Sequence, residues 1–539
     1  MSGLKRSILT HRWILSLVIL SCLPLISMLR VGTYESGDLT FQAYKLFSFY
    51  QNISNGHVVP QWSAELNASY GYPQFIFTYH LPYYIASIFH FFGFHLINSV
   101  KLTLALTYLL SGLFFYLWIR NHTSEKAAFV GALLYQFAPY RFVTMHFRAT
   151  LGESTALMIL PLCALALYTY FEKKTYASEI YAGITLAFLI LSHQAVSMLG
   201  IPFLLSYALY LGHFSFLKVL RPFIIGLLLS AYYWMPILLE SQYTLQAQSV
   251  ISVLHYSLIE FFISPWRYGL LYQGPHGELS PALGYVHWFV IIIACHLFIQ
   301  KKLKDFGILM LLLFIIYFLS AQSFSPTWKL LPILNKIQFS YRFLGVLVFI
   351  SATLGAFLSQ KIKTFHLYVL ISVLFITTFI NWGNRKVIPY APHSDFIAFS
   401  PYITEKGEGF DPAIPKWVDS KHPWKTVVPS KHVESVDGHI RLVREKRGYT
   451  DHLYWVDIPR DLLLIENTYF FPGWHVFVDG IERPITPYQG LITFSAPSGT
   501  HTIDVRFTQT PIRQFSSIIS LVALFLIITY PLYKPKHAH

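Results

Sequence analysis

Three short stretches of this chain carry ionisable side chains beside apolar segments, where such groups are costly unless they are paired or functional. They are Gly37-Asp38, Arg141 to Glu153 (RFVTMHFRATLGE) and Ser192-His193-Gln194. Asp38 and Glu153 supply carboxylates. These residue types suit a reaction in which one carboxylate takes a proton from an acceptor hydroxyl while cations hold a phosphate leaving group. The candidate anion partners are Arg141, His146, Arg148 and, further along the chain, Arg342.

Each candidate also has a structural explanation that the sequence does not exclude. An Asp just beyond a helix end, such as Asp38, is often a cap. Glu153 precedes an apolar segment, where an acidic residue favours the N-terminus of a helix. His193 could only polarise a turn, and Arg342 could anchor a lipid headgroup. Glu65 could be a solvated loop charge.

Composition places the chain in a membrane. It is 54% hydrophobic, and only 12% of its 539 residues are charged, about half the share that is usual in soluble domains. Apolar windows of roughly 17 to 25 residues, the length that crosses a bilayer, recur along most of the sequence. We predict twelve crossings, at 13–29, 100–119, 127–147, 154–171, 178–193, 195–211, 219–239, 282–300, 306–320, 341–359, 365–381 and 514–533.

The net charge of +14 follows from basic loops on the cytoplasmic side of the membrane and does not indicate a nucleic-acid partner. All basic clusters share one side only if the ambiguous segment 74–97 does not cross. We therefore predict a juxtamembrane or re-entrant helix there. The chain is then a multi-pass protein of the plasma membrane with both termini in the cytoplasm.

The region 382–511 differs from the rest. Short segments that alternate between apolar and polar residues, such as HIRLV, WHVFV and HTIDVRF, are separated by turn signals such as Asp479-Gly480. This pattern predicts a small extracytoplasmic antiparallel β-sandwich that folds independently. The predicted organisation is a transmembrane domain over 1–381 with a catalytic first external loop (30–99), the sandwich over 382–511, and a last helix with a basic tail over 512–539.

Nucleotide and zinc motifs are absent from the sequence, which has no Walker loop, HExxH or CxxC. Candidate site residues in an apolar, intramembrane setting instead indicate a lipid-linked substrate. The first external loop is rich in aromatic residues between 70 and 84, so we expect a folded cap over the site rather than a disordered connector.

Taken together, the motifs resemble those of the GT-C superfamily of membrane glycosyltransferases. The resemblance is carried by a GD pair in the first external loop, a W...LN..YGYP.F.F...LPYY segment, an APYR...R..LGE segment and an LSH turn. Within the superfamily the chain is most similar to YfhO-like bacterial proteins, through YFFPGW at 469–474 and Asp479-Gly480.

This resemblance implies an inverting transfer of sugar from a polyprenyl-phosphate donor to a glycan, lipid or protein acceptor of the cell envelope. Asp38 matches the catalytic base, and Glu153 matches a second acidic position that is Asp elsewhere in the superfamily. Arg148 and Arg342 would hold the phosphate. The other substrate-binding residues would be His193, which orders the sugar with Glu153, together with Glu65, Tyr72, Tyr79, Arg141 and His146.

The sequence leaves open whether a divalent metal ion (Mg or Mn) is needed, with Asp38 and Glu153 as its candidate ligands. It also leaves open two other kinds of protein. A transporter or flippase of lipid-linked sugars would use the same cations and aromatic residues without a base. A non-catalytic envelope protein would bind a partner or an envelope polymer through the sandwich, with the membrane part as a scaffold. Paired internal repeats, which are typical of transporters, are not evident in the sequence.

Overall fold

The computed structural model describes residues 2–213, 215–245, 255–263, 270–274, 278–383, 387–388, 413–419, 425 and 427–533. The chain divides into two compact units, each of which is described by itself. The first comprises Met1–Leu39, Tyr84–Leu227 and Ile251–Pro389, and the second comprises Thr40–Tyr83, Leu228–Val250 and Tyr390–His539.

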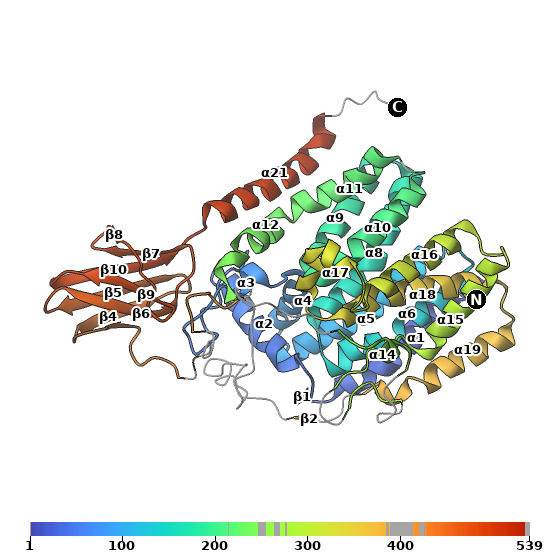
Figure 1. Cartoon of the computed structure of the whole chain (residues 1–539), viewed down its shortest axis with the longest axis horizontal. Helices are drawn as coiled ribbons and strands as arrows, with labels where there is room; N and C mark the ends of the chain where they lie inside the picture. The colour runs from blue at the N-terminus through green and yellow to red at the C-terminus, as the bar shows by residue number, and fades with distance from the viewer. Residues whose placement is uncertain are drawn as a thin grey trace. The chain divides into compact units, whose positions relative to one another are not determined.

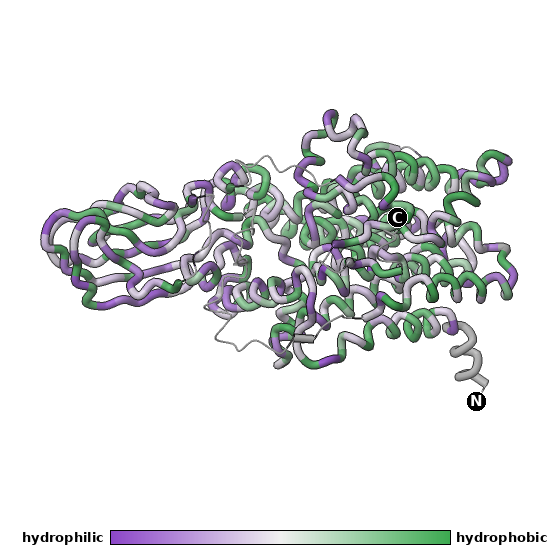
Figure 2. Tube along the Cα trace, turned by 60° about the horizontal axis from the view of Figure 1, so that its bottom comes forward, coloured by the Kyte–Doolittle hydropathy of each residue, from purple (hydrophilic) through white to green (hydrophobic). Residues whose placement is uncertain are grey.

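The first unit is a bundle of apolar helices (Figure 1). Within it, α8 packs on α5, α9 and α10, and α18 packs on α6, α15 and α16. Figure 2 shows that these helices are hydrophobic along most of their length. The longer helices are α1 (Ser2–Cys22), α5 (Leu96–Ile119), α6 (Glu125–Gln136), α8 (Leu151–Lys173), α9 (Tyr176–Ser192), α10 (Gln194–Leu211), α11 (Phe216–Leu229), α15 (Tyr285–Ile299), α16 (Asp305–Ser320), α18 (Leu344–Leu358) and α19 (Thr364–Ile376).

Helices underlie all twelve predicted crossings. Among the described residues, six are long and apolar enough to cross a membrane, or seven if α11 and α12 (Ala231–Glu240) form one broken span. The shorter apolar helices α9, α15, α16 and α19 correspond to four further predicted crossings. The mostly helical membrane architecture is therefore confirmed, whereas the number of crossings stays a prediction.

The predicted crossing at 127–147 is not one continuous helix. α6 ends at Gln136, a short helix α7 (Pro139–Phe142) follows, and the segment η2 (Val143–Phe147) is π-helical. Pro139 cannot donate a backbone hydrogen bond, and it disfavours helical geometry in the residue before it, so the helix breaks here. A π-helical turn often marks a functional site.

The region 74–97 also lacks a continuous helix. It holds α3 (Gln74–Phe77) and α4 (Leu81–Phe91). The 11 residues of α4 give a helix about 16 Å long, about half the thickness of a bilayer core of about 30 Å. That this region does not cross stays a prediction. Upstream of it, α2 (Leu39–Ser54) was not expected from the sequence.

The second unit contains two antiparallel sheets, as predicted for the region after 382 (Figure 1). The five-stranded sheet has the order β4-β5-β10-β7-β8, and the three-stranded sheet has the order β3-β6-β9. The strands are β3 (Val433–Ser435), β4 (Arg441–Arg447), β5 (Asp451–Ile458), β6 (Leu462–Tyr469), β7 (Trp474–Val478), β8 (Ile481–Arg483), β9 (Leu491–Ala496) and β10 (Gly499–Phe507).

Alternation along the strands builds the core of the sheets. In β5 every second residue is buried, from His452 to Ile458, because side chains of a strand point to opposite faces in turn. The predicted turn at Asp479-Gly480 joins β7 to β8, and both residues have positive φ, 50° and 80°. Two such residues make the tight turn whose twist suits a hairpin.

The second unit is larger than the predicted domain 382–511, because parts of the first external loop belong to it. Trp62 packs edge-on against Trp474, with ring centroids 5.2 Å apart. Arg513 begins the C-terminal helix α21 (Pro511–Tyr533), and it donates to Gln61 at 2.9 Å and to the carbonyl oxygen of Pro472. The YFFPGW motif is thus a contact point between the loop and the sheets. Independent folding of 382–511 stays a prediction, and these contacts argue against it.

Candidate functional site

A buried carboxylate, that of Glu153, is the centre of the candidate site in the first unit. Glu153 is the third residue of α8, and Thr150 is the N-cap. Thr150-Leu-Gly-Glu153 is the sequence of a capping box, yet Thr150 makes no side-chain cap. The Glu153 carboxylate accepts hydrogen bonds from arginines instead and has no exposed surface.

Two arginines from distant parts of the chain share this carboxylate. Arg148 donates from Nη1 to Oε2 at 2.7 Å, and Arg342 donates from Nε to Oε1 at 3.0 Å. Tyr140 also donates from its hydroxyl to Oε2 at 3.0 Å. Charge-assisted bonds of this kind are the stronger class of protein hydrogen bond. Glu153 therefore fixes both guanidinium groups in one place.

The backbone that carries Arg148 is unusual. The residue follows the π-helical turn η2, and Ala149 after it has a left-handed φ of 55°. A non-glycine residue in this region costs of order 1 kcal/mol, and such strain often occurs at functional sites. The carbonyl oxygens of Phe147 and Arg148 accept bonds from the amides of Gly37 and Asp38, both at 2.8 Å.

These backbone bonds bring the GD pair to the arginine cluster. Asp38 is half-buried and lies directly before α2, the position of a helix cap. Burial would lower the pKa of Arg148, but Glu153 and, more weakly, Asp38 raise it well above its ordinary value. Asp38 thus lies close enough to Arg148 for the two charges to interact.

His193 lies at the edge of the cluster as the N-cap of α10. Its Nδ1 accepts a bond from the amide of Val196 at 3.3 Å, which assigns the proton to Nε2. Nε2 lies 3.9 Å from Oε1 of Glu153. The structure therefore brings together the three sequence stretches singled out for chemistry.

Two tyrosines of the cluster were missed by sequence reasoning. Tyr140 bonds to Glu153, and the ring of Tyr341 lies under the guanidinium group of Arg148, 5.1 Å away. Both tyrosines directly precede an arginine, in APYR and FSYR. A tyrosine directly before an arginine was the sequence signal that could have pointed to these two residues, because arginine commonly stacks on aromatic rings.

Arg148 and Arg342 share the buried carboxylate of Glu153, and Asp38 places a second carboxylate near Arg148. Neither arginine is completely buried, with side chains 11% and 10% exposed. Each guanidinium group has five N–H donors, of which Glu153 takes one per arginine. The two guanidinium groups can bind an anion such as a phosphate, and Asp38 lies beside Arg148.

A divalent metal ion does not fit at Glu153, because the two arginines place positive charge beside both carboxylate oxygens. Among the described residues, no group of three or more His, Cys, Asp or Glu side chains could hold a metal ion.

Arg141 does not join Glu153. Its Nη2 donates to Ser111 at 2.7 Å, and its guanidinium group lies over the rings of Tyr108 and Tyr135, 5.6 and 5.3 Å away. This places it against α5 and α6. His146 is buried in η2, and its ring is parallel to that of Phe142.

The remaining predicted residues lie in the second unit. Glu65 accepts bonds from Ser48 at 2.9 Å and from Tyr449 at 2.6 Å, and burial raises its pKa. It is thus not a freely solvated charge. Tyr72 has no exposed surface, so its ring cannot stack on a sugar in this conformation. Tyr79 is half-buried and stacks on Tyr83, 5.7 Å away.

Comparison with solved structures returns two membrane glycosyltransferases. Arabinofuranosyltransferase AftD from Mycobacteria is 15% identical with a TM-score of 0.42, covering 69% of this chain and 27% of that one. The oligosaccharyltransferase of Archaeoglobus fulgidus is 13% identical with a TM-score of 0.42, covering 70% of this chain and 53% of that one.

Comparison with curated proteins and family models gives one relative and one family match. An uncharacterized protein of Lactococcus lactis subsp. cremoris (strain MG1363) is 25% identical over 190 residues, 33% of this chain and 30% of that relative. The match thus spans less than a third of the relative's length. The family described as 6-pyruvoyl-tetrahydropterin synthase related domain, membrane protein, matches residues 77–388. Its description differs from the YfhO-like group, so that finer resemblance stays a prediction. The family match covers more than half of the 539 residues of this chain. The chain therefore belongs to this family of membrane proteins.

Proposed function

We propose that this chain is a membrane glycosyltransferase that moves a sugar from a lipid-phosphate donor to an acceptor hydroxyl. The observation that carries the proposal is the pair of arginines fixed by Glu153 next to Asp38. Two adjacent guanidinium groups suit the phosphate of the donor, and a neighbouring carboxylate suits the removal of a proton. We further propose the extracytoplasmic side of the plasma membrane as the place of reaction.

In this mechanism Arg148 and Arg342 bind the donor phosphate. Asp38 accepts the proton of the acceptor hydroxyl while that oxygen attacks the anomeric carbon of the sugar. The bond between the anomeric carbon and the phosphate oxygen breaks, and its electron pair leaves with the lipid phosphate. The arginines stabilise the negative charge that develops there. Attack from the face opposite the leaving group inverts the anomeric carbon.

Glu153 has a positioning role in this proposal. Its carboxylate is buried and already accepts three hydrogen bonds, so it is poorly placed to touch the sugar. It holds two guanidinium groups close together, which would otherwise repel each other. This differs from the expectation that Glu153 orders the sugar together with His193.

The experiment measures sugar transfer by the full chain in lipid nanodiscs, with radiolabelled polyprenyl-phosphate sugars. Asp38→Asn should lower transfer at least about 100-fold, because the proton acceptor is lost. Donor binding should persist. Asn caps a helix about as well as Asp, so a mere cap would tolerate the change. Glu35→Gln, three residues upstream and exposed, is the matched control and should transfer normally.

Arg148→Gln and Arg342→Gln should weaken donor binding as well as transfer. Normal transfer by folded Asp38→Asn protein would remove Asp38 from the mechanism. Movement of the lipid-linked sugar across the bilayer without cleavage, unaffected by Asp38→Asn, would show a transporter instead.

A further inference from the structure

The outer face of the five-stranded sheet has a distinct composition. Side chains at alternate positions of β5, Tyr454, Val456 and Ile458, are buried against the other sheet, so the positions between them face outward. The strand register then places the outward residues of all strands in rows. We define the outer face by Arg441, Arg444 and Lys446 of β4, Asp451, Leu453, Trp455 and Asp457 of β5, Thr500, Thr502, Asp504 and Arg506 of β10, His475 and Phe477 of β7, and Glu482 of β8.

Two aromatic rings lie on this face and are partly exposed. Trp455 on β5 is paired with Thr502 on β10, and Phe477 on β7 is paired with Asp504 on β10. The rings are therefore two strands apart and offset by two residues. A strand spacing of about 4.8 Å and a rise of about 3.4 Å per residue place them about 12 Å from each other.

Polar groups fill the space around the rings. Thr500 donates to Asp457 at 2.7 Å. The guanidinium group of Arg444 lies 5.1 Å from the ring centroid of Trp455, and that of Arg506 lies 5.8 Å from the ring centroid of Phe477. Carboxylates and guanidinium groups side by side supply acceptors and donors at short spacing, which matches the paired hydroxyl groups of a sugar.

One end of the outer face is hollowed. A surface hollow of about 520 Å³ is lined by residues that include His439, Arg441, Asp457 and Thr500. Three of these belong to the row that ends the outer face.

We propose that the outer face of the five-stranded sheet and this hollow bind a glycan chain. Ring faces offer apolar contact to a sugar, and the charged side chains between them hydrogen-bond to its hydroxyl groups. Positive and negative side chains alternate across the face, as in Arg441 opposite Asp457. This balance fits a polyhydroxylated ligand better than a polyanion. The binding needs no sugar transfer by the membrane part.

The test uses the full chain in nanodiscs and immobilised neutral polysaccharides, namely laminarin, dextran and galactomannan. We expect at least one of them to retain the protein. The double variant Trp455→Thr and Phe477→Thr should weaken that retention about tenfold or more, and threonine suits a strand. Tyr488→Thr is the matched control, because Tyr488 is 48% exposed in the same domain and lies outside the outer face.

Three outcomes would overturn the proposal. The wild-type chain could fail to bind all three polysaccharides, or the double variant could bind as well as the control. Inorganic polyphosphate could also be retained in place of the polysaccharides, with the same dependence on Trp455 and Phe477, which would make the face an anion site. Far-ultraviolet circular dichroism of both variants checks that they are folded.

Discussion

A buried carboxylate between the two sheets, that of Glu466 on β6, offers the sharpest test of the structure. It accepts bonds from His452 at 2.9 Å, Tyr454 at 2.8 Å and Thr468 at 2.9 Å, and Arg447 lies 4.0 Å away. Burial alone would raise the pKa of Glu466, but His452 above all lowers it to about 2. We predict that Glu466→Gln destabilises the sheets.

The magnitude follows from the pKa. A fall from the ordinary 4.5 to about 2 corresponds to about 3 kcal/mol of stability carried by the ionised form. A glutamine oxygen can keep the bonds that Oε1 accepts. The amide nitrogen, however, would replace Oε2, which is buried and without a partner among the described residues. The charge contribution is lost and an unsatisfied donor is added, so we expect a loss of about 3 kcal/mol.

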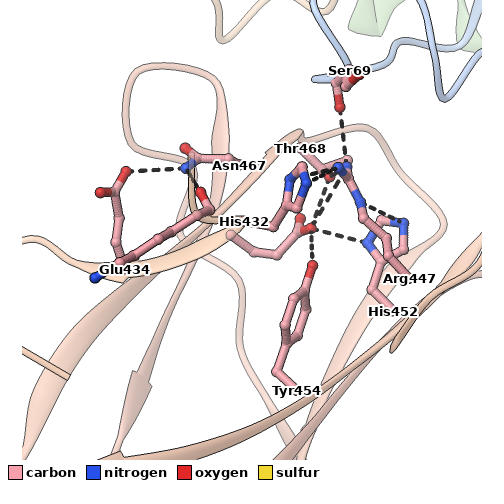
Figure 3. Close-up of polar contacts among 10 residues, drawn as sticks. Ser69, His432, Glu434, Arg447, His452, Tyr454, Asn467 and Thr468 are labelled. Carbon is pink, nitrogen blue, oxygen red and sulfur yellow. Dashed lines mark hydrogen bonds and ion pairs between the residues drawn. The ribbon is translucent and has the colours of Figure 1, made fainter. Parts of the chain in front are cut away.

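Hydrogen exchange of the full chain measures this loss in the strands themselves. A change of about 3 kcal/mol should speed the exchange of protected amides in β5 and β6 about 150-fold. Glu434→Gln is the matched control. Its exposed carboxylate accepts one bond, from Asn467 at 3.0 Å (Figure 3), and its loss should cost under about 1 kcal/mol.

The pH dependence of hydrogen exchange provides a second test of the role of Glu466. The pKa of Glu466 is lower in the folded chain than in the unfolded chain, so its contribution is complete above about pH 4.5 and is lost as pH falls towards 2. Burial lowers the pKa of His432 to about 4, so its contribution is lost as pH falls from 6.5 through 4. In the wild-type chain, protection of the strand amides from exchange should decline both between pH 6.5 and 4 and between pH 4.5 and 2. In Glu466→Gln the decline between pH 4.5 and 2 should be absent. Equal exchange in Glu466→Gln and Glu434→Gln would refute the reasoning.

Two further predictions concern a glycine and the topology. Gly473→Ala should destabilise the second unit by about 3 kcal/mol, because a Cβ would lie 2.5 Å from the Thr508 carbonyl oxygen and from Arg513. Gly480→Ala, also at positive φ but in open space, should cost about 1 kcal/mol, and thermal unfolding compares the two. In a Cys22→Ser background, Ser124→Cys and Ser498→Cys should react with impermeant thiol reagents from opposite sides of the membrane. Labelling of both from outside would contradict the predicted topology.

Much of the architecture was predictable from local patterns. Apolar windows located a helix within each predicted crossing, and alternation with an Asp479-Gly480 turn located the sheets. Pro139 was a visible signal for a helix break, but the apolar residues on both sides of it led to the prediction of a single crossing over 127–147. α2 was missed because its aromatic and polar residues have no strong period, and the contacts that stabilise it, such as Ser48 with Tyr449, lie 401 residues apart.

The candidate site was also predictable only in part, because some of its contacts join residues that are far apart in the sequence. Sequence order indicated that Asp38, Arg148 and Glu153 belong together, since each adjoins an apolar segment on one side of the predicted membrane. It could not show that Glu153 is saturated by Arg148 and Arg342, because Arg342 is 189 residues away. Nor could it show that Arg141, close to Arg148 in sequence, packs among tyrosines instead.

The motifs that carry the family resemblance fall into two groups with different physical roles. The GD pair and the R..LGE segment meet in the first unit, where their charges suit chemistry. The LN..YGYP and FPGW segments lie in the second unit, where Asn67, Ala68 and Ser69 all have left-handed φ. Arg447 donates to the carbonyl oxygen of Ser69 at 3.1 Å, and Tyr469 donates its amide to Tyr70 at 3.0 Å. These segments hold a strained turn in place. A case for catalysis therefore rests on the first group alone.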